Sequence, residues 1–303
     1  MKNKFAIFAL AALILASLAC NSTEPQTVPT QTVPHQTTPT LTDPQAQETR
    51  TSTIDTQQEA FLTPETWLAS PQTCSQSMTM LISEESSASS ATIVLEEKWV
   101  DPQGNTVWVY YLLGSDHGIS KQITATYTLI PGKSTKIYDD YQAAFLNYSK
   151  LNTSSGLKDI DAGILSLFSL TRIDRAGTVP LGLDKIKTGE DIPDGSSPYF
   201  AFSYPGQTIT AQFSISTHVH TYKSKEPYEM TFSPSNTTTN RGSSGGPICD
   251  SSGNVIAIIS SNPGYHPTNY YAVPLPQNIS TQIMSAIEAS HKILQTNNIT
   301  KAP

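Results

Sequence analysis

The strongest constraint on the fold is a series of short apolar, β-branched and aromatic runs that begins near Pro64, each followed by a turn signal. Such runs are typical of β-strands. Many short strands without interleaved helices predict an all-β barrel or sandwich. The predicted strands are Met78–Ser83, Ala91–Trp99, Thr106–Leu113, Gln122–Leu129, Ala143–Leu151, Ala162–Phe168, Tyr199–Tyr204, Thr208–Ser216, Tyr228–Ser233, Pro247–Cys249, Val255–Ser260 and Tyr270–Val273.

Turns and one helix complete the predicted elements. Asp101–Asn105 and Asp250–Asn254 are predicted hairpin turns, because each places Asp, Gly and Asn between two apolar runs. In Ile279–Leu294 the apolar residues recur at helical spacing, which predicts one helix that packs as a C-terminal lid on a barrel.

The first residues have the pattern of an export signal. Lys2 and Lys4 precede the apolar run from Phe5 to Ala16, and small residues follow up to Cys20. This order is typical of a secretory signal peptide, residues 1–19, and the apolar run is too short for a permanent transmembrane helix. The cleavage site suits ordinary signal peptidase, and it also resembles a bacterial lipobox in which Cys20 becomes the lipidated first residue.

Residues 20–63 are predicted to form a stalk between this signal and the folded domain. Thr, Gln and Pro fill 24 of the 40 residues 21–60, and such a segment cannot bury enough apolar surface to offset its ordering entropy. The stalk would hold a domain at residues 64–296 away from a membrane, with 297–303 as a tail. The alternative is a disordered N-terminal segment with no tethering role.

Charge narrows the classes of partner. The chain has 18 basic and 25 acidic residues, a formal charge of −7, which argues against nucleic-acid binding as the main function. No phosphate-binding glycine motif is present, and we expect no cofactor. His218 and His220 could ligate a metal from one face of a strand, but exposed polar residues are the favoured interpretation, so no metal site is predicted.

The candidate catalytic motif is Gly242-Ser243-Ser244-Gly245-Gly246-Pro247, in which a serine lies between glycines. A nucleophilic serine needs a backbone that exposes its hydroxyl and directs N–H groups toward an oxyanion, and flanking glycines permit that turn. The motif lies in the β-rich region and precedes a strand, a tight turn and a second strand. It resembles the nucleophile loop of trypsin-like (chymotrypsin-fold) serine proteases, and the resemblance extends over about Cys74 to Leu294.

This resemblance implies an all-β fold of two six-stranded barrels and a catalytic order of His, Asp and Ser along the chain. His117 follows a strand as the family's histidine does, although Gly114-Ser115-Asp116 stands where the family has Thr-Ala-Ala. Asp159 and Asp161 both precede an apolar strand, and Asp161 aligns better. His117 would then be the general base, Asp161 its orienting carboxylate and Ser244 the nucleophile.

The resemblance also implies the substrate-binding groups. The backbone N–H groups of Gly242 and Ser244 would form the oxyanion hole. Thr238 would lie at the base of the S1 pocket and Ser260 on the strand that forms one wall. Because Thr238 carries no charge, we expect a small or medium neutral side chain at P1. Ser243 stands where zymogens of the family carry an aspartate that pairs with a freed amino terminus, so we expect no such activation step.

Two function hypotheses follow. The first is a monomeric serine endopeptidase that acts on proteins or peptides and is exported, either lipid-anchored at the cell surface through Cys20 or secreted. The second is a protease-like binding lipoprotein without turnover. In an exported domain Cys74 and Cys249 can be bonded, and two buried thiols fit the sequence equally well.

Overall fold

A computed structural model of the chain describes residues 72–83, 88–120, 126–131, 141–156, 159–173, 180–190, 199–204, 214–217, 222–223, 230–232, 242–261 and 270–303. The predicted signal peptide, the predicted lipidation site Cys20 and the predicted stalk lie outside these residues. So do Thr238 and the pair His218 and His220. Within the described ranges, no helix is long and apolar enough to cross a membrane.

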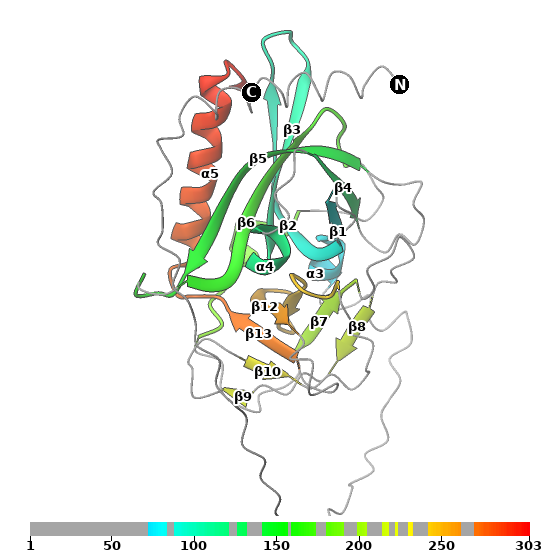
Figure 1. Cartoon of the computed structure of the whole chain (residues 1–303), viewed down its shortest axis with the longest axis vertical. Helices are drawn as coiled ribbons and strands as arrows, with labels where there is room; N and C mark the ends of the chain where they lie inside the picture. Colours follow the sequence, from blue (N-terminus) through cyan, green and yellow to red (C-terminus); the bar gives the residue numbers. More distant parts are fainter. Residues whose placement is uncertain are drawn as a thin grey trace, which may run out of the picture.

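The first sheet is antiparallel and surrounds the N-terminal half of the core (Figure 1). Its strand order is β1-β4-β5-β6-β3-β2-β14, and β1 also pairs with β2, so that the first six strands form a continuous ring of pairings. The strands are β1 (Met78–Ser83), β2 (Ala88–Val100), β3 (Thr106–Gly114), β4 (Thr126–Pro131), β5 (Tyr141–Asn152), β6 (Asp159–Ser169) and β14 (Thr300–Lys301).

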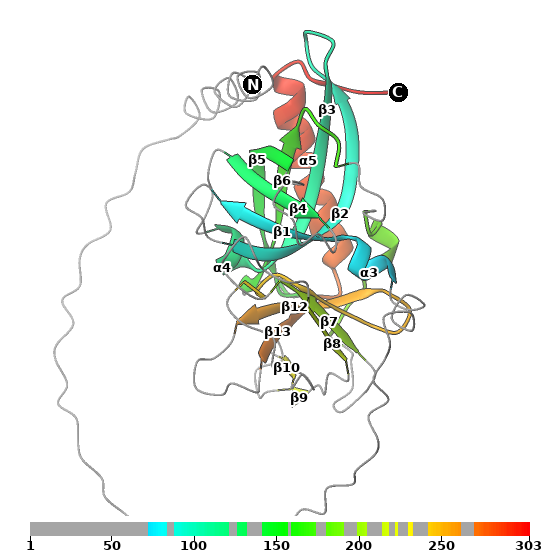
Figure 2. The ribbon, with the colours of Figure 1, turned by 90° about the vertical axis from the view of Figure 1, so that its right-hand side faces the viewer.

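The second sheet contains the C-terminal strands, in the order β8-β7-β11-β12-β13-β10-β9. It lies below the first sheet in both ribbon views, Figure 1 and Figure 2. The strands are β7 (Phe200–Ser203), β8 (Ser214–Thr217), β9 (Tyr222–Lys223), β10 (Met230–Phe232), β11 (Pro247–Cys249), β12 (Val255–Ser261) and β13 (Tyr270–Pro274). No pairing closes this second sheet among the residues that the structure describes.

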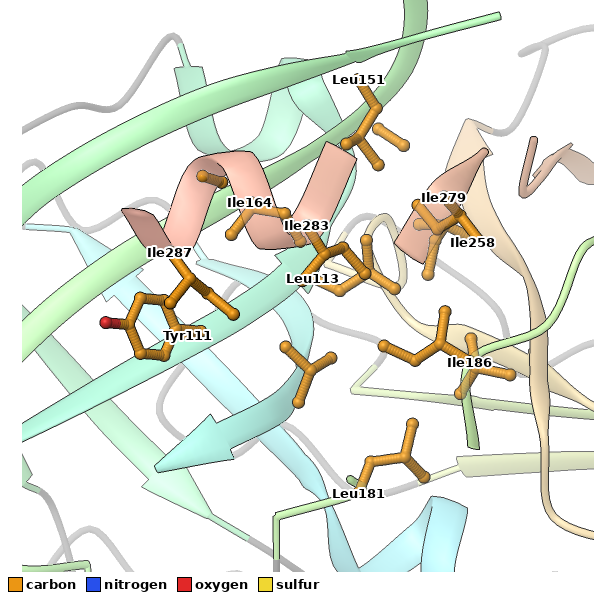
Figure 3. Packing of buried hydrophobic residues seen from close by; sticks show 14 of the residues in the cluster. Tyr111, Leu113, Leu151, Ile164, Leu181, Ile186, Ile258, Ile279, Ile283 and Ile287 are labelled. Atoms are coloured by element: carbon orange, nitrogen blue, oxygen red, sulfur yellow. The ribbon is translucent and has the colours of Figure 1, made fainter. Parts of the chain in front are cut away.

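Helices accompany the sheets in the described part of the chain: α3 (Gln72–Gln76), α4 (Asp116–Ile119), the 3-10 turn η3 (Leu183–Lys185) and α5 (Ile279–Thr296). In α5, Ile279, Ile283 and Ile287 recur every four residues and are each at most 2% exposed, because this spacing places them on one face. Figure 3 shows them directed toward Leu113 and Ile164 of the first sheet and Ile258 of the second. One apolar cluster therefore joins both sheets and the helix.

Two hairpin turns confirm the predicted turn chemistry. In the turn between β2 and β3, Asp101 Oδ1 accepts hydrogen bonds from the backbone N–H groups of Gln103 (2.9 Å) and Asn105 (2.7 Å). Asp250 accepts N–H groups two and four residues ahead, at 2.9 Å each, between β11 and β12. An Asp side chain that caps its own turn in this way fixes the loop length and hence the register of the flanking strands.

A disulfide joins Cys74 in α3 to Cys249 at the end of β11, with the two Cα atoms 6.7 Å apart. It links the start of the described domain to the second sheet. Of the two alternatives that the sequence left open for these cysteines, the structure shows the bonded one.

The structure confirms a mostly β fold with a C-terminal helix. The finer expectation of two six-stranded barrels stays a prediction, since each sheet has seven described strands and only the first closes. Residues 297–303, expected to be a tail, include β14, which pairs with Trp99 and Val100 of β2. The buried Ile299 precedes it, so this segment extends the first sheet.

Candidate active site

His117 lies in α4, the single helical turn that follows β3 at the border between the two sheets (Figures 1 and 2). It contacts Asp161 at two points. Its backbone N–H donates to Asp161 Oδ1 at 2.8 Å, and its ring Nδ1 lies 2.7 Å from Asp161 Oδ2. Because a carboxylate only accepts, Nδ1 carries the proton, and Nε2 is the proton acceptor of the neutral ring.

Asp161 lies near the start of β6, and only 27% of its side chain is exposed. Its Oδ2 also accepts a hydrogen bond from the Ser260 hydroxyl of β12. Burial alone would raise the pKa of Asp161, but the hydrogen bonds from His117 and Ser260 outweigh it and hold this pKa below its ordinary value. Asp161 is therefore a charged group that fixes the orientation of the imidazole.

Ser244 lies in a tight loop that two glycines make possible. Gly242 and Gly245 have φ angles of 99° and 90°, a region that residues with a Cβ rarely adopt. The Gly245 N–H donates to the Ile259 carbonyl at 2.7 Å, which holds the loop against β12. A Cβ at Gly245 would lie 1.9 Å from the Ser90 carbonyl oxygen, so that only glycine allows this approach.

The same loop lies against the segment that carries His117. The Ser90 N–H donates to the Ser244 carbonyl at 2.8 Å, and a Cβ at Gly245 would also lie 3.2 Å from the Ser115 backbone nitrogen. Ser115 precedes His117 by two residues. Among the described residues, however, the Ser244 hydroxyl makes no hydrogen bond with the His117 ring. In enzyme structures without bound substrate, catalytic hydrogen bonds are often long and shorten only in the complex.

The two serines of the motif differ in exposure. Ser243 is 2% exposed, and its buried hydroxyl has no hydrogen-bond partner among the described residues. Ser244 is partly exposed. Of the two serines, Ser244 is thus the more accessible from solvent. Among the described residues, neither the Gly242 N–H nor the Ser244 N–H donates a backbone hydrogen bond.

A family model supplies the comparison that decides the classification. Residues 101–258 match the trypsin-like peptidase domain. The chain belongs to this family. No curated protein sequence matches it significantly.

Two solved structures are similar in fold at low sequence identity, and a third matches with a lower TM-score. The scabies mite inactivated protease paralogue S-I1 is 14% identical, with a TM-score of 0.52 over 72% of this chain and 96% of that protein. Human heparin binding protein is 9% identical, with a TM-score of 0.51 over 73% of this chain and 94% of that protein. The thermostable serine protease AL20 from an extremophilic microorganism is 12% identical, with a TM-score of 0.46 over 71% and 99%.

Within this trypsin-like domain, the structure brings together three of the residues singled out in the sequence, His117, Asp161 and Ser260. The Ser260 hydroxyl donates to Asp161, and the expected role of Ser260 in substrate binding stays a prediction. A further acidic residue of the sequence, Asp116 directly before His117, contacts Tyr148 and Lys150 in the structure. No cluster of three or more potential metal ligands occurs in the described ranges.

Proposed function

We propose that the chain is a serine endopeptidase that hydrolyses peptide bonds through an acyl-enzyme. The observation that carries the proposal is the two-point contact between His117 and Asp161 beside the glycine-rich Ser244 loop. A trypsin-like domain supports peptide binding in general. The arrangement of two barrels with the site between them is part of the same proposal.

In the proposed mechanism, Ser244 Oγ attacks the carbonyl carbon of the scissile bond while His117 Nε2 takes the hydroxyl proton. Asp161 stabilises the imidazolium that forms. The N–H groups of Gly242 and Ser244 donate to the oxyanion of the tetrahedral intermediate. His117 then gives the proton to the leaving amine, and a water molecule, deprotonated by the same ring, hydrolyses the acyl-enzyme and regenerates Ser244.

Labelling with a fluorophosphonate probe tests this proposal. We expect the purified domain to form one covalent adduct and the Ser244→Ala variant to form none, while the Ser252→Ala variant, altered at an exposed turn, labels normally. Both variants should keep the melting temperature, because neither hydroxyl fills the core. An unlabelled, folded wild-type domain would instead support the alternative, a protease-like binding lipoprotein.

Localisation and specificity are finer parts of the proposal. We propose that the domain is exported and tethered at the cell surface by a lipid on Cys20, and that it prefers small or medium neutral P1 side chains. Mass spectrometry of the mature N-terminus tests the anchor, since Cys20→Ser should release an unlipidated protein. Cleavage of a peptide library tests P1, and a dominant preference for Arg, Lys or Glu would contradict it.

A further inference from the structure

A second set of contacts holds the segment that carries His117. Asp116 directly precedes the histidine, and only 16% of its side chain is exposed. One of its carboxylate oxygens accepts a hydrogen bond from the Tyr148 hydroxyl, and the other lies 2.8 Å from Lys150 Nζ. Lys150 Nζ also lies 3.3 Å from the exposed carboxylate of Asp159. Asp116 thus contacts two side chains of β5.

Strand pairing explains how Asp116 reaches them. Gly114 at the end of β3 pairs with Gly163 of β6, and Gly163 pairs with Lys150 of β5. The chain turns after Gly114 into α4, which packs on β6. Asp116 therefore extends across β6 to β5, while His117 contacts Asp161 on β6 itself.

Gly163 leaves the space for this crossing. It lies two residues after Asp161, so both face the same side of β6. A Cβ at Gly163 would lie 2.6 Å from Cε2 of Tyr148 and 2.8 Å from its hydroxyl oxygen, which means that the tyrosine ring rests directly on this glycine. A larger residue there would displace the ring from Asp116.

The charge states suit a permanent contact. Burial alone would raise the pKa of Asp116, but Lys150 and Tyr148 outweigh it and hold this pKa below its ordinary value. Burial and the Asp116 carboxylate both raise the pKa of Tyr148, so the phenol stays a hydrogen-bond donor.

We propose that Asp116 is a positioning residue, which fixes the His117 ring against Asp161 by anchoring α4 to Tyr148 and Lys150 of β5. This inference rests on the proposed function. A helix of four residues has no stability of its own, so the position of α4 depends on such anchors. Asp161 holds the ring from β6, and Asp116 prevents the helical turn from sliding along that strand.

The test combines kinetics with proton NMR of the bond between His117 Nδ1 and Asp161, which gives a resonance far downfield of the amides. In Asp116→Ala, we expect kcat to fall about 10- to 100-fold with KM nearly unchanged, and the resonance to broaden or disappear. Asp116→Asn still accepts from Tyr148 and should recover part of kcat. Asp159→Asn, which alters the other partner of Lys150, should change neither readout.

Each outcome decides the inference. Wild-type kcat and an unchanged resonance in Asp116→Ala would overturn it. If circular dichroism shows that Asp116→Ala is unfolded, Tyr148→Phe replaces it, because this variant removes only the hydroxyl contact with Asp116. A lower kcat and a broadened resonance in Tyr148→Phe would support the inference, and wild-type values of both would overturn it. If the wild-type domain neither hydrolyses peptides nor reacts with the fluorophosphonate, the proposed function fails, and the resonance in the Asp116 variants still decides the positioning role.

Discussion

Ser260 of the second sheet donates a hydrogen bond from its hydroxyl to Asp161 of the first sheet, on the carboxylate oxygen that also faces the His117 ring. The two residues are 99 positions apart. This contact connects the sheets at the candidate site, and together with the His117 hydrogen bonds it keeps the pKa of Asp161 low. The orientation of His117 thus depends on how the two sheets pack.

Ser260→Ala should lower kcat/KM about 10- to 100-fold, because Asp161 loses a hydrogen bond to a charged group worth about 1.5–3 kcal/mol. The pKa of Asp161 should move up toward its ordinary value, which NMR titration measures. Ser252→Ala, in the turn between β11 and β12, is the control. An unchanged kcat/KM in Ser260→Ala would show that the contact does not support catalysis.

Asp161→Asn should lower kcat on the order of 10⁴-fold, because the amide favours the wrong tautomer of His117. Asp159→Asn is the matched control, since the Asp159 side chain is 64% exposed and makes no contact with His117 within the described part of the chain. Steady-state kinetics on a peptide substrate measure both. A large loss in Asp159→Asn with near-full activity in Asp161→Asn would reverse the assignment of the carboxylate.

Gly245→Ala should abolish activity and destabilise the domain, because the new Cβ would lie 1.9 Å from the Ser90 carbonyl oxygen at a φ of 90°. Gly104→Ala separates the two causes. Gly104 has a φ of 83° but open space around it. The unfolding free energy of Gly104→Ala should therefore fall only by the conformational cost of the left-handed backbone, about 1–2 kcal/mol, and the variant should keep its activity. Equal stability losses in urea unfolding would contradict the close-contact explanation.

The disulfide should appear in the intact mass, with neither Cys74 nor Cys249 alkylated before reduction. The double variant Cys74→Ala/Cys249→Ala should lose about 2–4 kcal/mol of unfolding free energy, since the bond closes a loop of 175 residues. Cys20→Ser, in the segment predicted to precede the folded domain, is the control. Two alkylated cysteines in the unreduced protein would rule out the bond in solution.

The stability at low pH should depend on Glu97, whose side chain is 8% exposed. It accepts hydrogen bonds from His291 of α5 (2.7 Å), Lys301 of β14 (2.6 Å) and Tyr111 of β3 (3.0 Å). Burial alone would raise the pKa of Glu97, but these partners hold it below the ordinary 4.5. Its stabilising effect is therefore fully present above pH 4.5 and is lost as the pH falls through the folded-state pKa.

Glu97→Gln should lower the unfolding free energy by about 1.5–3 kcal/mol at neutral pH. The difference from the wild type should shrink as the pH falls below 4.5, because Glu97 then becomes protonated. Urea unfolding at a series of pH values measures the difference from the wild type. Glu288→Gln, at an exposed position of α5, is the control. A loss that stays constant with pH would show that packing, and not charge, explains the effect.

Local patterns in the sequence determined most of the strands and turns. The predicted bounds of β1 and β11 agree with the structure, and the Asp101 and Asp250 turns form as expected. These features depend on residues within a few positions of one another, so periodicity and turn chemistry describe them fully. The spacing of Ile279, Ile283 and Ile287 likewise determined which face of α5 is buried. The catalytic roles of His117, Asp161 and Ser244 stay predictions.

Contacts between distant segments were decided only by the tertiary structure. Asp116 meets Tyr148 and Lys150 because β3, β6 and β5 pair in that order, and nothing in the local sequence specifies this order. Ser260 reaches Asp161 only when the two sheets pack. The strand β14 follows α5, which packs on β5 and β6, and it pairs with β2 from the other end of the domain sequence. The physical reason is that periodicity shows which side of a strand is buried, while strand pairing depends on the free energy of the whole core.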